Sequence, residues 1–139
     1  MFYRAWYAFI RPHTRSDMTT SIIIPELGFY YHYKHDVMGP VNNYAYEFNG
    51  VAHHTEDDCR PEDTYMAIYR PIYLDAKVYR EGGLYDARPL EMWCSRVSIG
   101  EHISVPRFRL ITSRKVLKKL SLIYFEMYQE IPRFLMQRL

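Results

Sequence analysis

The chain has 139 residues, of which 48% are hydrophobic, and its 18 basic and 16 acidic residues leave a formal net charge of +2. This length fits one domain with its own core, and the near balance of charge argues against DNA or RNA as a partner. The apolar runs are shorter than the roughly 20 residues that cross a bilayer, so we expect a single cytoplasmic domain over residues 1–139, with no membrane contact.

Strand signals fill the first part of the chain. The segment from Phe2 to Ile10 is dense in aromatic residues and predicts a strand buried on both faces. A β-branched run at Ile22–Ile24 and a strand at Phe29–Lys34 follow. The next strand, Tyr44–Phe48, leads into Asn49-Gly50, a pair that favours a tight hairpin turn.

Three more strands are expected after polar interruptions. Residues 57–63 and 75–83 are charged and predict loops, and the segment between them, Tyr65–Tyr73, alternates as a strand. Arg88–Val97 and Pro106–Ile111 supply the last strands.

Only the tail predicts a long helix, over residues 113–131. Apolar residues recur there at steps of three and four, at Val116, Leu117, Leu120, Ile123, Met127 and Ile131. Ser113 can cap the helix and Pro132 can end it. Two roles stay open: the helix covers an edge of the domain's own sheet, or it contacts a second copy in a homo-oligomer.

Three short signatures stand in order between residues 27 and 110. They read Gly28-Phe29-Tyr30-Tyr31-His32-Tyr33-Lys34, then Gly50-Val51-Ala52-His53-His54-Thr55-Glu56, then Arg88-Pro89-Leu90-Glu91-Met92-Trp93. Together they resemble the bacterial and viral family Domain of Unknown Function 1653. We expect a mainly β, α+β fold: a small, antiparallel, partly open β-barrel over residues 27–110, with an added N-terminal strand and a C-terminal helix. The loops at 57–63 and 75–83, and Tyr85-Asp86-Ala87 in place of the usual Trp-Val, depart from the family pattern.

The family has no assigned activity, so a ligand site is predicted from side chains alone. Tyrosine rings can stack a base, arginine or lysine can bind a phosphate, and histidine or threonine can bond a ribose or phosphate oxygen. The predicted ligand-binding residues are Tyr31, Tyr33, Lys34, His53, His54, Thr55, Glu56, Arg70, Tyr85 and Arg88. Two structural alternatives stay open: the histidines bond a neighbouring backbone, and Arg88 pairs with Glu56 or Glu91.

These residues predict a non-catalytic protein that binds a small nucleotide-like ligand and needs no cofactor. Because the resembled family occurs in viruses, a sponge that sequesters a nucleotide immune signal in the host cytoplasm is the concrete form of this hypothesis. The 14 tyrosines also suit a second hypothesis, an inhibitor or adaptor that docks on a protein through a tyrosine-rich face and the C-terminal helix.

An enzymatic alternative comes from two short motifs. His53-His54-Thr55 and His102-Ile103-Ser104 both fit the His-x-Thr/Ser pattern of two-histidine phosphoesterases, whose imidazoles act as acid and base. A metal site is the weakest alternative, because neither His32 with His35 nor His53 with Asp57 or Asp58 has the spacing of a known ligand motif. We therefore predict no metal.

Overall fold

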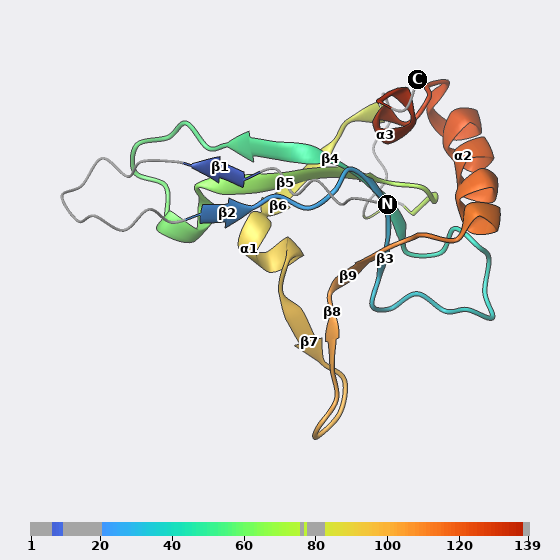
Figure 1. Cartoon of the computed structure of the whole chain (residues 1–139), viewed down its shortest axis with the longest axis horizontal. Coiled ribbons are helices and arrows are strands. Elements are labelled where there is room, and N and C mark those ends of the chain that lie inside the picture. The colour runs from blue at the N-terminus through green and yellow to red at the C-terminus, as the bar shows by residue number, and fades with distance from the viewer. Residues whose placement is uncertain (1–6, 10–20, 76, 78–82, 138–139) are drawn as a thin grey trace.

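The computed structural model describes residues 7–9, 21–75, 77 and 83–137. Its strands are β1 (Tyr7–Phe9), β2 (Ser21–Ile23), β3 (Gly28–His32), β4 (Ala45–His53), β5 (Tyr65–Pro71), β6 (Asp86–Pro89), β7 (Arg96–Ser98), β8 (Ser104–Pro106) and β9 (Phe108–Leu110) (Figure 1). Its helices are the 3-10 turn η1 (Pro61–Asp63), α1 (Leu90–Trp93), α2 (Arg114–Tyr128) and α3 (Arg133–Met136).

The centre of the fold is an antiparallel sheet with the strand order β6-β5-β4-β3-β9. This confirms the mainly β, α+β class. The edge strands β6 and β9 do not pair with each other, so the sheet is open and the expected barrel is not formed. The sheet is nevertheless curved. Its curvature is indicated by a contact across one face between side chains of the two edge strands, Arg88 on β6 and Phe108 on β9. The described part of the predicted N-terminal strand is β1, which pairs with β2 in a separate ladder; the rest of Phe2–Ile10 lies outside the described residues.

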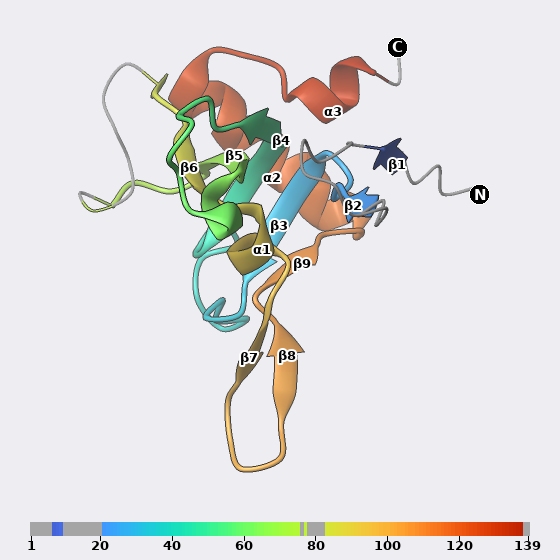
Figure 2. The same cartoon turned by 90° about the vertical axis from the view of Figure 1, so that its left-hand side faces the viewer.

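Alternation along the strands divides the sheet into two faces. One face, here the helix face, packs against α2 and α3 through Phe29, Ala45, Ile72, Ile111, Leu120, Tyr124 and Phe134. The other, here the aromatic face, carries Tyr30, Tyr46, Phe48, Ala67, Tyr69 and Phe108, with Leu90 and Trp93 of α1 packed on them. Figure 2 shows α1 and α2 on opposite sides of the sheet.

The predicted hairpin turn at Asn49-Gly50 is wrong, because β4 runs through it to His53. The pairing of β4 with β5 shifts between Phe48 and Gly50, which marks a β-bulge. Gly50 has a φ of 131°, a conformation that a residue without a Cβ adopts readily. The strand therefore continues because β5 offers partners as far as Tyr65, opposite His53.

The predicted strand at Arg88–Val97 is interrupted by α1. Pro89 has no N–H to donate, so it ends the β6 ladder, and Leu90 and Trp93 then bury the same side of one helical turn. The chain continues into the β7–β8 hairpin, which projects away from the sheet (Figures 1 and 2).

The predicted C-terminal helix is confirmed as α2. The Ser113 hydroxyl accepts a hydrogen bond from the Val116 N–H at 3.4 Å, so Ser113 is the cap. The helix ends earlier than predicted, because Gln129 takes a left-handed conformation with a φ of 53°, and Pro132 instead starts α3. No helix in the described part of the chain combines the length and apolar character needed to cross a membrane.

Candidate functional site

Arg88 lies over the aromatic face, where the two edges of the curved sheet approach each other. Its neighbour in the ladder is Ala67, which is fully buried and too small to block a long side chain. The guanidinium carbon lies 5.6 Å from the ring centres of both Tyr69 and Phe108. These distances fit cation–π contacts, so two rings from different strands hold the arginine in place.

The charge of Arg88 has no acidic partner among the described residues. The ion pairs found there involve Arg60 and Arg70, and the buried Nε of Arg88 has no hydrogen-bond partner. The structural alternative, an ion pair of Arg88 with Glu56 or Glu91, is therefore not formed. A partly buried cation with an unmet N–H costs stability, and an anionic ligand would relieve that cost.

His32 lies on the same face and is neutral at physiological pH. Burial, followed by the charges of Arg88, Arg107 and Lys34, lowers the pKa of His32 to about 4. Its Nδ1 accepts the Lys34 backbone N–H at 3.4 Å, which leaves Nε2 to carry the proton and to donate. The site thus combines a positive potential with a neutral hydrogen-bond donor.

Three tyrosines border this position. The hydroxyls of Tyr46 and Tyr73 are hydrogen-bonded to each other, and burial raises the pKa of both. The Tyr44 ring is 38% exposed and lies 5.8 Å from the His32 ring at an angle of 24°. Tyr44 has a φ of 52°, which is uncommon for a residue with a side chain and is frequent at functional positions. The set Arg88, His32, Tyr44, Tyr46, Tyr69, Tyr73 and Phe108 is called the Arg88 site below.

Two further predicted residues lie beside the Arg88 site. The Tyr33 ring contacts His32 with ring centres 4.5 Å apart, and Lys34 is exposed next to it. The sequence analysis singled out Arg88, Tyr33 and Lys34. It missed His32 as a ligand residue, and it also missed Tyr44, Tyr46, Tyr69, Tyr73 and Phe108. Strand alternation gave a signal for His32, because it places His32 on the same face as Tyr30.

Tyr31 is not brought to the Arg88 site, because it points to the opposite face of β3. Its hydroxyl donates to the Val41 carbonyl at 2.5 Å, and its ring stacks on His35 at 3.5 Å. The Nδ1 of His35 bonds the Asn43 carbonyl at 2.8 Å. These contacts fasten the loop between β3 and β4.

The His53–Glu56 segment is also apart from the Arg88 site, at the far end of β4. The His54 backbone N–H donates to the Thr64 carbonyl at 2.8 Å, and its Nδ1 accepts the Glu56 N–H at 3.2 Å. His53, Thr55 and Glu56 are exposed. The segment forms a local turn, and the His53 ring contacts the Tyr65 ring, with the ring centres 5.7 Å apart.

Arg70 and Tyr85 belong to the helix face. Arg70 is 1% exposed and pairs with Glu130 at 2.6 Å, and it also donates to the Tyr124 hydroxyl. Its guanidinium carbon lies 3.9 Å from the Tyr128 ring centre and 4.3 Å from that of Tyr85. The two predicted site arginines thus lie on opposite faces, and Arg70 is fully engaged within the fold.

The described residues do not form the arrangement that either the enzymatic or the metal alternative requires. His102 is exposed in the projecting β7–β8 hairpin, whereas His54 follows the end of β4. No group of three His, Cys, Asp or Glu side chains within the described ranges could hold a metal ion.

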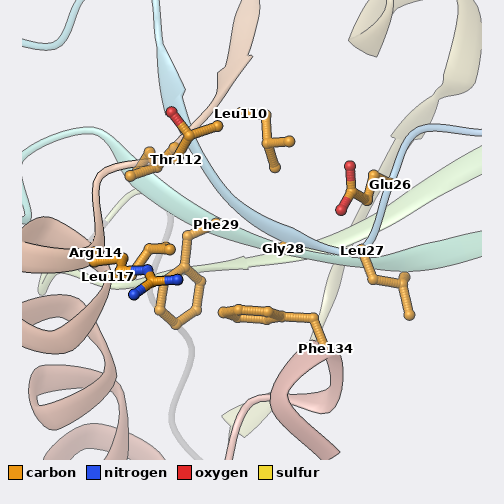
Figure 3. A pocket seen from close by; sticks show the side chains of 10 residues that line it. Glu26, Leu27, Gly28, Phe29, Leu110, Thr112, Arg114, Leu117 and Phe134 are labelled. Carbon is orange, nitrogen blue, oxygen red and sulfur yellow. The ribbon is translucent and has the colours of Figure 1, made fainter. Parts of the chain in front are cut away.

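A separate pocket of about 250 Å³ lies between β3, β9, α2 and α3. Figure 3 shows Glu26 and Arg114 on opposite sides of it, with Phe29 and Phe134 between them. Its volume falls below the usual range for ligand pockets, roughly 300–1,000 Å³, and both of its charged side chains are exposed. The partly buried charge of Arg88 marks the stronger candidate.

The low pKa of His32 predicts a dependence of stability on pH. His32 stays neutral in the folded protein down to about pH 4, whereas the unfolded chain binds a proton near pH 6.5. The contribution to stability is therefore complete above pH 6.5 and is lost as the pH falls toward 4, by about 1 kcal/mol after solvent screening. Urea unfolding should be measured above pH 6.5 and near pH 4. Between these two conditions, His32→Gln should lose less unfolding free energy than the wild type. The exposed His102→Gln should behave like the wild type, and an equal loss in all three proteins would contradict the assignment.

The family model described as Protein of unknown function (DUF1653) matches residues 28–110. This match covers more than half of the chain, so the chain belongs to that family, as the three signatures indicated. The comparisons with curated proteins and with solved structures found no match. The family region contains every strand of the five-stranded sheet and the whole Arg88 site, whereas α2 and α3 lie outside it.

Proposed function

We propose that this member of the DUF1653 family binds a small, flat anionic ligand of the nucleotide class at the Arg88 site and holds it without turnover. The observation that carries the proposal is the Arg88 guanidinium, which is partly buried between Tyr69 and Phe108 and lacks an acidic partner within the described residues. Buried charges in proteins are normally paired, so this charge is suited to a ligand phosphate or carboxylate.

The residues around Arg88 supply the other contacts that such a ligand needs. Lys34 and Arg107 add positive charge near His32, and the Nε2–H of His32 can donate to a ligand oxygen. The partly exposed Tyr44 ring offers a stacking surface, a contact of roughly 1–3 kcal/mol per base. Sequestration of a nucleotide immune signal in the cytoplasm of an infected host would use this chemistry without any catalytic step.

The substitution Arg88→Met tests the proposal. Loss of a charge-assisted contact should weaken binding by about 30-fold, equivalent to about 2 kcal/mol. Calorimetric titration of the full chain with cyclic dinucleotides, cyclic mononucleotides and nucleoside diphosphates measures the effect, with inorganic phosphate as a minimal anion. The matched control is Arg109→Met. Arg109 follows Phe108 on β9 and points to the other face of the sheet, so this variant should bind the ligand like the wild type.

The same variant gives a second measurement that separates a ligand residue from a structural one. Because Arg88 lacks an acidic partner in the described structure, Arg88→Met should leave the free energy of unfolding unchanged or raise it. If the wild type binds none of these anions, or if Arg88→Met binds as well as Arg109→Met, the proposal is wrong.

A further inference from the structure

The outer face of α2 exposes two apolar side chains, one in the middle of the helix and one in its last turn. Leu122 is 62% exposed and Phe125 is 49% exposed. They border an almost wholly carbon-lined groove of about 370 Å³ that also includes Leu117, Ile131 and Leu135. Figure 1 shows α2 at the outer edge of the molecule, with no described element beyond it.

The charges on α2 are separated along its length. Arg114, Lys115, Lys118 and Lys119 occupy its first half, whereas Glu126 lies in its second half and Glu130 follows its end. The first turn has no acidic residue and the last turn has no basic residue. This order opposes the helix macrodipole, which favours acidic residues at the start and basic residues at the end. The separation therefore does not stabilise an isolated α2.

The pattern is self-complementary about Leu122. Lys118 and Glu126 are both exposed and lie equally far before and after Leu122. If a twofold axis passes beside Leu122, a second α2 runs antiparallel to the first. Lys118 of one copy then meets Glu126 of the other, and the two macrodipoles also oppose each other favourably. A parallel arrangement would instead place lysine against lysine.

We propose that the chain forms a symmetric homodimer in which two α2 helices pair antiparallel, with Leu122 and Phe125 at the centre and lysine–glutamate pairs on both sides. The occupant of the apolar groove is Phe125 of the second copy. A helix of 15 residues is about 22 Å long, and together with the Ile131–Leu135 segment it can supply a modest interface. This inference is independent of ligand binding at the Arg88 site, which lies on the other face of the sheet.

The test is a charge exchange, measured by sedimentation equilibrium of the full chain. Lys118→Glu and Glu126→Lys should each weaken the dimer by at least about tenfold, because each change places two like-charged pairs in a symmetric interface. The double variant Lys118→Glu/Glu126→Lys restores both pairs and should dimerise like the wild type. Lys77→Glu, an exposed charge in a loop, is the matched control.

Leu122→Arg adds a control for the apolar centre. It should abolish the dimer and leave the circular dichroism spectrum unchanged, because Leu122 is exposed in the monomer. A wild type that sediments as a monomer at its highest soluble concentration would overturn the proposal, and so would a double variant that stays as weak as the single ones. If something other than a second copy occupies the groove, the wild type would sediment as a monomer.

Discussion

Replacing Arg70 with methionine is expected to lower the free energy of unfolding by about 3–5 kcal/mol. Arg70 is buried among Tyr124, Tyr128 and Tyr85, and it lies directly opposite Glu47 in the ladder between β4 and β5. Glu47 is also buried. Burial raises the pKa of Glu47, whereas the neighbouring Tyr124 hydroxyl and the Arg70 charge lower it. Without Arg70, the Glu47 carboxylate would lie in the core without the larger of the two positive charges that act on it, and only Arg133 would remain.

Urea unfolding at neutral pH measures this loss. Arg109→Met, an exposed arginine on the same sheet, should cost less than about 0.5 kcal/mol. The double variant Arg70→Met/Glu47→Gln should recover part of the loss, because it also removes the acid that Arg70 compensates. A cost below about 1 kcal/mol for Arg70→Met would mean that this buried cluster does not hold α2 to the sheet.

Trp93→Ala is expected to cost about 3–5 kcal/mol, because it empties the centre of the aromatic face. Trp93 is 2% exposed, and its ring stacks on Phe108 at 3.7 Å with an angle of 6° between the planes. It also contacts Tyr69 and Phe48 at ring distances of 5.1 and 5.2 Å. Since Tyr69 and Phe108 hold the Arg88 guanidinium, the loss of Trp93 should also weaken ligand binding.

Trp93→Phe is the matched control, because it makes the side chain smaller without removing its aromatic character. It keeps an aromatic ring on Phe108 and should cost about 1–2 kcal/mol, with ligand affinity largely kept. Thermal unfolding and the titration described for Arg88→Met check both readouts. Equal destabilisation by alanine and phenylalanine would show that ring stacking on Phe108 does not stabilise this face.

The tail helix could be predicted from sequence because its signals are local. Ser113 caps α2, and apolar residues at helical spacing face the sheet. Local signals do not predict that the expected strand at Arg88–Val97 is interrupted by α1. Its interruption depends on where Leu90 and Trp93 find a buried surface, and that surface is made by β3, β4, β5 and β9.

The two predicted site arginines, Arg70 and Arg88, show how far the ligand site could be predicted from the sequence. Nothing near Arg70 or Arg88 in the sequence tells which of them is enclosed by aromatic rings and acids and which lacks an acidic partner. The difference arises because Arg70 faces α2, 54 residues later in the chain, whereas Arg88 crosses the curved side of the sheet. Tyr31 and His32 pose the same problem, since adjacent strand residues point to opposite faces and alternation alone does not say which face has a helix layer.

The β7–β8 hairpin is built almost entirely from its own contacts. The Arg96 side chain bonds Ser104 within the hairpin, and Arg107 fixes its base by donating to Ser95. The tip between Ser98 and Ser104 therefore supports neither the aromatic face nor α2. It is a natural place to insert an affinity peptide or a fluorophore, so that the protein can be immobilised or followed in cells with its core and both proposed surfaces intact.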